Sequence, residues 1–231
     1  MKKVRTILCF GDSNTYGAVP TLARVGRHRF APGRRWTGVL GRQLGGDWEI
    51  VQEGHPSRTT VSDDPIEGGH KNGLKALPIS LESHMPLALV ILMLGTNDLK
   101  HRFAASPGDI ADSIEVLVRT IQRSEAGRGG SEPRVLLVSP PPIQEVDWIG
   151  ELFLGGAVKS RKLTAKLEDV ASRCDAAFLD AGAIIESSTV DGIHLDDDAH
   201  RALGTALAAM VTGMFADERG PKRQGGRVRS D

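Results

Sequence analysis

A serine, a histidine and an aspartate of this sequence stand in contexts that suit nucleophilic chemistry. Ser13 ends a Gly-Asp-Ser triplet that follows a short apolar run, and Asp191 precedes His194 by three residues. A serine hydroxyl is a weak nucleophile until a neighbouring imidazole removes its proton, and that imidazole needs a carboxylate to fix its tautomer and stabilise its cation. Asp191 and His194 can meet without another segment, whereas Ser13 has to come from the other end of the chain.

A tetrahedral intermediate at such a serine carries a developing oxyanion, which needs donors that are in place before the reaction. Asn97, in the run Gly-Thr-Asn-Asp at 95–98, can offer its side-chain amide. The backbone N–H groups of Ser13 and Ser57 can supply two more donors. Each motif alone is more often a turn, a helix cap or a surface pair. Their occurrence together favours a site for acyl chemistry.

Other kinds of site find less support. Gly17 lies four residues after Ser13, so the G-x-S-x-G elbow of α/β-hydrolases is absent. Neither G-x-G-x-x-G nor a Walker A lysine follows the first apolar run, which argues against dinucleotide and ATP binding. We therefore expect no cofactor. The remaining histidines lack close ligand spacing, so we expect surface or loop positions and no metal site for His28, His55, His70, His84, His101 and His200.

The strands that must position these residues follow from hydrophobic patterning. Five apolar runs have the length of strands: 4–10, 48–51, 87–94, 135–138 and 176–179. Two of them are nearly continuous in Val, Ile, Leu and Met, as in parallel strands that are buried on both faces. Polar residues follow three of the runs. Because ligands gather at the carboxyl ends of strands in doubly wound sheets, we expect the site there.

Helical patterns alternate with these runs. Ser106, Pro107 and Asp109 form a helix start, with a serine cap, a proline in the first turn and an acid three residues after the cap. Further apolar stripes indicate helices over 163–174 and over 203–214, the latter behind an acidic start. Shorter candidates are 36–44 and 74–84, the second weakened by a proline at 78.

The alternation of strands and helices predicts one three-layer α/β/α domain over residues 1–216. Two segments, 18–34 and 140–156, are long for connecting loops, and we expect them to be irregular. The segment 217–231 is rich in Arg, Lys and Gly and poor in apolar residues, which predicts a disordered tail.

Composition limits the function further. The chain has 231 residues with 29 Lys+Arg against 29 Asp+Glu, and this balance gives no reason to expect a nucleic-acid partner. Two cysteines, Cys9 and Cys174, cannot form a disulfide framework and favour a reducing compartment. No apolar run approaches the ~20 residues that span a bilayer, and the stretch 7–10 is too short for a signal peptide. We expect a cytoplasmic protein that acts on a small molecule, away from membranes.

The motifs in this order resemble those of the SGNH hydrolases, the GDSL family of serine esterases and lipases. Gly-Asp-Ser at 11–13 resembles the nucleophile block, Gly-Thr-Asn-Asp at 95–98 the block with the oxyanion asparagine, and Asp-Gly-Ile-His at 191–194 the Asp-x-x-His block. The resemblance implies a flavodoxin-like sheet of five parallel strands. It also implies Ser13, Asp191 and His194 as catalytic residues, and Ser13, Ser57 and Asn97 as the oxyanion hole.

The sequence departs from the family pattern at two positions. Asn14 replaces the leucine of GDSL, and Ser57 aligns with the usual oxyanion glycine. A backbone N–H survives at Ser57, but its conformation and the space beside it change. For the substrate pocket we expect six residues, two of them in the long second loop, where core packing is an equally plausible role: Asp12, Asn14, His55, Trp148, Phe153 and Ile193.

Four runs resemble the bacterial arylesterase and acyltransferase branch of the family: 36–40, 58–60, 95–98 and 138–142. That resemblance implies short acyl esters as substrates, acyl transfer to alcohols or peroxide as side reactions, and a homo-oligomer. A carbohydrate deacetylase of the same superfamily is one alternative. A non-catalytic binding module on a hydrolase scaffold is the alternative from another class.

Overall fold

The computed structural model describes residues 4–24, 26 and 28–216. Its centre is a sheet of five parallel strands in the order β2-β1-β3-β4-β5. This is the flavodoxin-like order. The strands are β1 (Arg5–Gly11), β2 (Trp48–Gly54), β3 (Leu87–Met93), β4 (Arg134–Ser139) and β5 (Ala177–Asp180). All five overlap the predicted runs.

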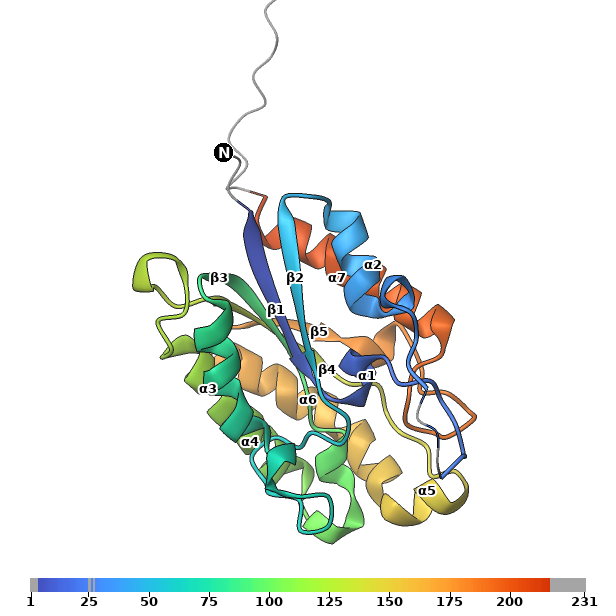
Figure 1. Cartoon of the computed structure of the whole chain (residues 1–231). Helices are drawn as coiled ribbons and strands as arrows, with labels where there is room; N and C mark the ends of the chain where they lie inside the picture. The colour runs from blue at the N-terminus through green and yellow to red at the C-terminus, as the bar shows by residue number, and fades with distance from the viewer. Residues whose placement is uncertain (1–3, 25, 27, 217–231) are drawn as a thin grey trace, which may run out of the picture.

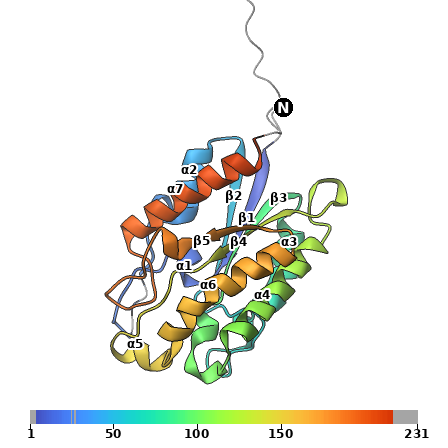
Figure 2. The same cartoon turned by 180° about the vertical axis from the view of Figure 1, so that it is seen from behind.

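Helices cover both faces of the sheet, which confirms the three-layer α/β/α prediction (Figures 1 and 2). One face carries α2 (Trp36–Leu44) and α7 (Asp197–Met214), which pack on each other. The other face carries α3 (Gly73–His84), α4 (Pro107–Gln122) and α6 (Gly156–Arg173). Two short helices, α1 (Ser13–Tyr16) and α5 (Asp147–Leu152), lie between strands and longer helices.

The central strands send alternate side chains into two separate cores. In β1, Leu8 and Phe10 join the cluster under α3, α4 and α6, whereas Ile7 and Cys9 join the cluster under α2 and α7. Successive side chains of a strand point to opposite faces, so a strand covered on both sides needs apolar residues at every position. This requirement explains the continuous apolar runs of the sequence.

The helix starts agree with their sequence signals. The Ser106 hydroxyl accepts from the N–H of Asp109, and the Asp109 carboxylate accepts from the N–H of Ser106, which forms a capping box at α4. Helix α3 continues through Pro78 to His84 despite the hydrogen bond that proline removes. Leu77 and Leu81 are buried against the sheet on either side of the proline, and this packing stabilises the helix.

Part of the segment 140–156, predicted to be irregular, is helical. It contains α5, and α6 begins at Gly156, several residues before the predicted stripe. Helix α5 has six residues, including Gly150, and is too short to show helical periodicity.

The prediction that every remaining histidine lies at the surface or in a loop is wrong for His200. This residue is fully buried in α7, where its Nδ1 accepts from the backbone N–H of Trp36 at 3.3 Å and its ring packs on Phe30. The N–H of Trp36 belongs to the first turn of α2 and has no partner within its own helix. Burial lowers the pKa of His200 to about 4, so the imidazole is neutral and can accept.

The strand order gathers the carboxyl ends of β1, β2 and β3. At this edge Gly54 lies against α1, and a Cβ at Gly54 would stand 2.1 Å from the backbone N of Tyr16. A side chain therefore cannot be accommodated at Gly54, and the short helix that begins with Ser13 lies directly over the end of β2.

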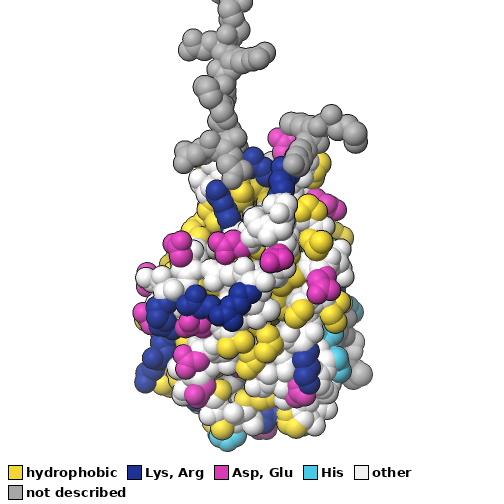
Figure 3. Space-filling view, turned by 90° about the vertical axis from the view of Figure 1, so that its left-hand side faces the viewer, with side chains coloured by type: hydrophobic (Ala, Val, Ile, Leu, Met, Phe, Trp, Pro, Cys, Tyr) yellow, Lys and Arg dark blue, Asp and Glu magenta, His cyan; other side chains and the backbone are white. Residues whose placement is uncertain are grey.

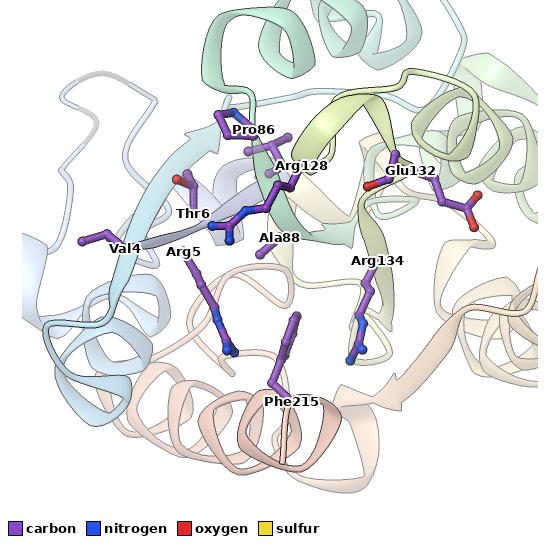
Figure 4. A pocket seen from close by; sticks show the side chains of 11 residues that line it. Val4, Arg5, Thr6, Pro86, Ala88, Arg128, Glu132, Arg134 and Phe215 are labelled. Carbon is purple, nitrogen blue, oxygen red and sulfur yellow. The ribbon is translucent and has the colours of Figure 1, made fainter. Parts of the chain in front are cut away.

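The opposite edge of the sheet holds a cavity of about 260 Å³. Figure 4 shows Arg5 and Arg134 on either side of Phe215, with Arg128 directed toward the same space. Val4 and Phe215 both line this cavity, so the two ends of the described chain lie side by side. The predicted tail 217–231 lies outside the described residues.

The described surface carries both signs of charge. On the face shown in Figure 3, basic and acidic side chains alternate with apolar ones. On α4, Glu115 pairs with Arg119 and with Arg173 of α6. Within the described ranges, no helix has the length and apolar character needed to cross a membrane.

Candidate active site

Ser13 is the first residue of α1, directly after the central strand β1. The Asp12 carboxylate caps this short helix by accepting from the N–H of Asn14 at 2.9 Å. The turn closes with hydrogen bonds from Tyr16 N–H to Asp12 C=O and from Gly17 N–H to Ser13 C=O. These local hydrogen bonds hold Ser13 at a helix N-terminus, beyond the carboxyl end of the sheet.

The structure brings Ser13, His194 and Asp191 into one continuous hydrogen-bonded chain. Ser13 Oγ lies 3.0 Å from His194 Nε2, and His194 Nδ1 lies 2.7 Å from Asp191 Oδ2. The carboxylate fixes the histidine tautomer with the proton on Nδ1, which leaves Nε2 as an acceptor for the serine proton. This is the geometry that activates a serine hydroxyl.

Asp191 is fully buried, and its immediate surroundings keep it ionised. Burial alone would raise the pKa of this carboxyl, but the hydrogen bond and charge of His194, together with the N–H groups of His194 and Ile193, hold the pKa at about 2. Asp191 Oδ2 also accepts from the N–H of Thr21 at 2.9 Å. The irregular segment 18–34 therefore contacts the site through its backbone.

The turn between Asp191 and His194 depends on Gly192. This residue has φ 76°, and a Cβ would lie 2.1 Å from the carbonyl O of Gln144. Gln144 is also hydrogen-bonded to the turn, because its N–H donates to Gly192 C=O at 2.8 Å. The segment that follows β4 thus supports the aspartate and the histidine from outside.

Ser57 lies in the loop that follows β2 and has φ 64°, in the left-handed region that favours glycine. This explains why glycine is usual here in the family that the sequence resembles. Neither the N–H of Ser57 nor that of Ser13 donates to another described backbone group in the loops and caps of the molecule. Both are available to an incoming oxygen atom.

Asn97 follows β3 and begins a short 3-10 turn, η3 (Asn97–Leu99). Its Nδ2 donates to the carbonyl O of Arg58 at 3.1 Å and lies 3.5 Å from Asp12 Oδ2. The amide of Asn97 is therefore held between the loop after β2 and the residue before Ser13. These two segments carry the other candidate donors, the N–H groups of Ser57 and Ser13.

Two buried side chains fasten the loop after β2, and the sequence motifs did not single them out as site residues. The Arg58 guanidinium stacks on Phe10 at 4.1 Å and donates to the carbonyl O of Gly11 at 2.9 Å and to that of Glu53. Burial lowers the pKa of Arg58 to about 10. The Asp98 carboxylate accepts from the N–H and hydroxyl of Thr60.

Asp12 shows the opposite pKa shift from Asp191. Burial, assisted by the charge of Asp98, raises the pKa of Asp12 to about 6, although the N–H of Asn14 and the positive charge of Arg58 oppose the shift. Asp12 touches the capped helix and the Asn97 amide, so its protonation state bears on both.

Of the six residues expected in the substrate pocket, two have buried side chains in the apolar core, Phe153 and Ile193. Asn14 is also buried, and its Nδ2 donates to the carbonyl O of Ile193. Trp148 is partly buried, and its indole N–H donates to the carbonyl O of Leu22 at 3.0 Å. The two long segments of the sequence thus touch beside Asp191.

The remaining candidate, His55, lies beside the loop of Ser57. His55 Nε2 lies 3.2 Å from Lys71 Nζ, and its ring packs edge-on against His70. Within residues 4–24, 26 and 28–216, no group of three or more His, Cys, Asp or Glu side chains is arranged to hold a metal ion.

Further members of the site could not be recognised from motifs. One of them is the backbone N–H of Thr21, and a backbone donor leaves no signature in the residue type. Glu67, Lys100 and Arg102 form an ion-pair cluster next to the loop of Ser57. The only sequence signal for this cluster was the pair of basic residues shortly after the Gly-Thr-Asn-Asp run.

Comparison with known proteins identifies relatives in sequence and in structure. The sequence profile of the GDSL-like Lipase/Acylhydrolase family matches residues 9–202. The aryl esterase of M. smegmatis has a similar structure, with a TM-score of 0.86 and 45% identity over 91% of this chain and 99% of that one. A carbohydrate acetylesterase from Sinorhizobium meliloti gives a TM-score of 0.88 with 39% identity, over 91% of this chain and all (100%) of that one. No curated protein sequence matches the chain.

The matched residues run from β1 into α7 and include the three motif blocks and Ser57. Both structural relatives exceed one third identity over nearly their whole length. The chain therefore belongs to the GDSL-like lipase/acylhydrolase family and is an esterase of the SGNH type.

Proposed function

We propose that this protein hydrolyses short-chain acyl esters through an acyl-enzyme at Ser13. The observation that carries the proposal is the continuous chain from Ser13 Oγ through His194 to the buried Asp191. The resemblance to an aryl esterase over nearly the whole of that protein supports aryl and alkyl esters as substrates.

In the first half of the reaction, Ser13 Oγ forms a bond to the ester carbonyl carbon while His194 Nε2 takes the serine proton. Asp191 stabilises the imidazolium that results. The carbonyl oxygen becomes an oxyanion that accepts hydrogen bonds from Ser13 N–H, Ser57 N–H and the Asn97 amide. When the tetrahedral intermediate collapses, the bond to the alcohol oxygen breaks and His194 returns the proton to that leaving group.

In the second half, a water molecule attacks the acyl-enzyme, with His194 again acting as the base. The bond to Ser13 Oγ then breaks, His194 returns the proton to that oxygen, and the carboxylic acid leaves. An alcohol that takes the place of water gives a new ester, and hydrogen peroxide gives a peracid. We include acyl transfer and perhydrolysis as side reactions, and product analysis with and without an alcohol acceptor tests them.

Replacement of Ser13 tests the main proposal. Ser13→Ala should abolish hydrolysis of p-nitrophenyl acetate and labelling by a fluorophosphonate probe, while circular dichroism and the unfolding midpoint stay close to those of the wild type. Full activity or labelling in this variant would refute the assignment of Ser13. A wild-type protein that is folded but does not react with the probe would instead favour a binding module.

Deacetylation of carbohydrates is a second candidate, favoured by the likeness to the carbohydrate acetylesterase. The chemistry at Ser13 would be the same, with a sugar as the leaving alcohol. A comparison of kcat/KM for acetylated sugars and for aryl acetates of equal acyl length separates the two substrates. The same measurement over a series of p-nitrophenyl esters defines the acyl length.

We also propose that the protein assembles as a homo-oligomer. Several apolar side chains stand exposed at the end of α5, in the turn after it, on α6 and in the segment that precedes Asp191: Leu152, Leu154, Val158, Ile184 and Val190. Burial of such side chains against a second copy would remove apolar surface from water. Sedimentation analysis of the wild type and of a Leu154→Glu variant tests this, and a wild-type monomer would refute it.

A further inference from the structure

Residues 55–58 form a β-turn with Ser57 at its third position. The N–H of Arg58 donates to the carbonyl O of His55 at 3.1 Å and closes the turn. Proline at the second position and a positive φ at the third, 64° for Ser57, are the features of a type II turn. Glycine suits that third position best, because a Cβ is strained there. Ser57 therefore occupies a conformation that its side chain disfavours.

The competing conformation is a type I turn, which differs mainly in the central peptide unit, here the one between Pro56 and Ser57. Type I also accepts proline at its second position, and its negative φ at the third position suits serine. Conversion of type II into type I rotates the central peptide by roughly 180°. The N–H of Ser57 would then point in nearly the opposite direction, away from its place in the candidate oxyanion hole.

The side chain of Lys71 contacts the other end of this same peptide unit. Lys71 Nζ donates to the carbonyl O of Pro56 at 3.0 Å. The C=O and N–H of a planar trans peptide point in opposite directions, so a contact that fixes the carbonyl of Pro56 also fixes the N–H of Ser57. A hydrogen bond from an ammonium group is stronger than one between neutral groups, which favours the type II form of the turn.

Lys71 is itself held in place for this contact. The residue is buried, with 7% of its surface exposed. Its carbonyl O accepts from the N–H of Thr59 at 2.9 Å, which ties its backbone to the residue that follows the turn. Its Nζ also lies 3.2 Å from His55 Nε2, and because an ammonium group can only donate, the imidazole accepts. Lys71 is thus joined to the chain on both sides of Ser57.

We propose that Lys71 is a positioning residue for the oxyanion hole: by donating to the Pro56 carbonyl it holds the turn in the form that directs the Ser57 N–H toward the oxyanion. The inference rests on the proposed esterase function. Serine at position 57 makes this support necessary, since a glycine adopts the same turn without strain. Lys71 acts through the peptide group, and its role requires no contact with substrate.

Lys71→Met tests the proposal because it keeps an unbranched side chain but removes the donor. Loss of one complete oxyanion donor costs about 10²–10³-fold in kcat, so a donor that is misdirected in most of the molecules should cost about tenfold, with KM for p-nitrophenyl acetate changed by less than about twofold. In a Ser57→Gly background the turn needs no support, and Lys71→Met should change kcat by less than about twofold there. Complete labelling by a fluorophosphonate counts the active sites, so unfolded molecules do not enter kcat.

Lys159→Met is the matched control. Lys159 on α6 also donates to a backbone carbonyl, that of Ala105, at 2.8 Å, but this contact lies outside the loop of Ser57. The substitution removes the same kind of hydrogen bond, so it should lower the unfolding midpoint and keep kcat within about twofold in both backgrounds.

A loss of kcat from Lys71→Met that is as large in the Ser57→Gly background as in the wild type would overturn the proposal, and so would no loss in either. A rise in KM at constant kcat would overturn it as well, because that result indicates substrate binding. If the wild type neither hydrolyses p-nitrophenyl acetate nor reacts with a fluorophosphonate, the esterase proposal itself fails. An active wild type with independent effects of the two substitutions removes only the role of Lys71.

Discussion

The segment that carries Asp191 and His194 and the loop that carries Ser57 are fixed in different ways. Asp191 accepts from the N–H groups of Ile193 and His194 as well as from the imidazole, so the segment closes largely through its own residues, to which Thr21 and Gln144 add backbone contacts from outside. The Ser57 loop is held by side chains from elsewhere, among them Asn97 and Asp98. One half of the site is built locally and the other half by long-range contacts.

The difference indicates which substitutions each half tolerates. In the local half, a substitution that keeps a side-chain oxygen to accept from the backbone N–H groups should retain the turn and reduce mainly the catalytic rate. In the long-range half, the same chemistry depends on charged groups many residues away, so distant substitutions should change the reaction rate. Substitutions in each half test this contrast.

Among substitutions that compare the two halves, the largest effect is expected for Asp191→Asn. The amide oxygen can still accept from the N–H groups of Ile193 and His194, so the turn should persist, but the amide cannot stabilise the imidazolium or enforce its tautomer. We expect kcat to fall about 10³–10⁴-fold, less than in Ser13→Ala, and the unfolding midpoint to fall moderately, because the bonds of Thr21 N–H and His194 to the charged Oδ2 are lost. Steady-state kinetics with p-nitrophenyl acetate and thermal unfolding measure both.

Failure of Asp191→Asn to fold at neutral pH would contradict closure of this segment by its own hydrogen bonds. The pH dependence offers a second check. Asp191 has a folded pKa of about 2 against an ordinary value of 3.8, so the stability that its ionisation provides should be present above pH 4 and should disappear as the pH falls toward 2. The variant should lack this acid-dependent component.

Asn97→Ala should have the next largest effect. It removes the one side-chain donor of the candidate oxyanion hole together with the hydrogen bond to Arg58, and we expect a loss of about 10²-fold in kcat. Labelling of Ser13 by a fluorophosphonate should slow by a similar factor. An unchanged rate would exclude Asn97 from stabilising the oxyanion.

Arg58→Met tests the long-range half through a residue outside the motifs. Methionine can still pack on Phe10 but cannot donate to Gly11 or Glu53. We expect a loss of about 2 kcal/mol in unfolding free energy, measured with urea, and about a tenfold loss in kcat.

Arg35→Met is the control for this prediction. Arg35 is also buried and donates to the carbonyl O of Phe30 at 2.8 Å, but it does not contact the Ser57 loop. It should lose stability and keep kcat within about twofold. Equal losses of kcat in the two variants would mean that rate follows stability alone.

The smallest effect is expected for Asp12→Asn, and it concerns stability. The folded pKa of Asp12 is raised from 3.8 to about 6, so the carboxyl favours folding when protonated and this contribution is lost as the pH rises from about 4 to 6. The variant has no charge to bury and should be more stable than the wild type at pH 8, by on the order of 2 kcal/mol. The difference should vanish near pH 4, and a difference independent of pH would contradict burial of the charge as its cause.

The sequence predicted the strands and the local half of the site because both depend on short-range patterns. Buried parallel strands need continuous apolar residues, and an Asp-x-x-His segment can close on itself. The strand order was implied only by the family resemblance, since periodicity does not say which strands are neighbours. Helix α5 was missed because six residues are too few for a periodic pattern.

The long-range half could not be predicted for a different reason. Thr60 and Asp98 are 38 residues apart in the sequence, and only the fold brings them together in the loop that carries Ser57. His200 shows the same limit: its spacing to Leu203 and Leu207 places it on the buried stripe of α7, but its partner, the N–H of Trp36, comes from a distant helix. Apolar patterns reveal burial, whereas polar partners require the tertiary structure.

The two ends of the described chain meet beside the cavity of Val4 and Phe215, while Ser13 follows the other end of β1. The seven residues of β1 separate these places by roughly 20 Å. A group attached at Val4 or at Phe215 would consequently lie on the side of the sheet away from Ser13. The topology of the sheet thus keeps both ends of the described chain clear of the site (Figure 1).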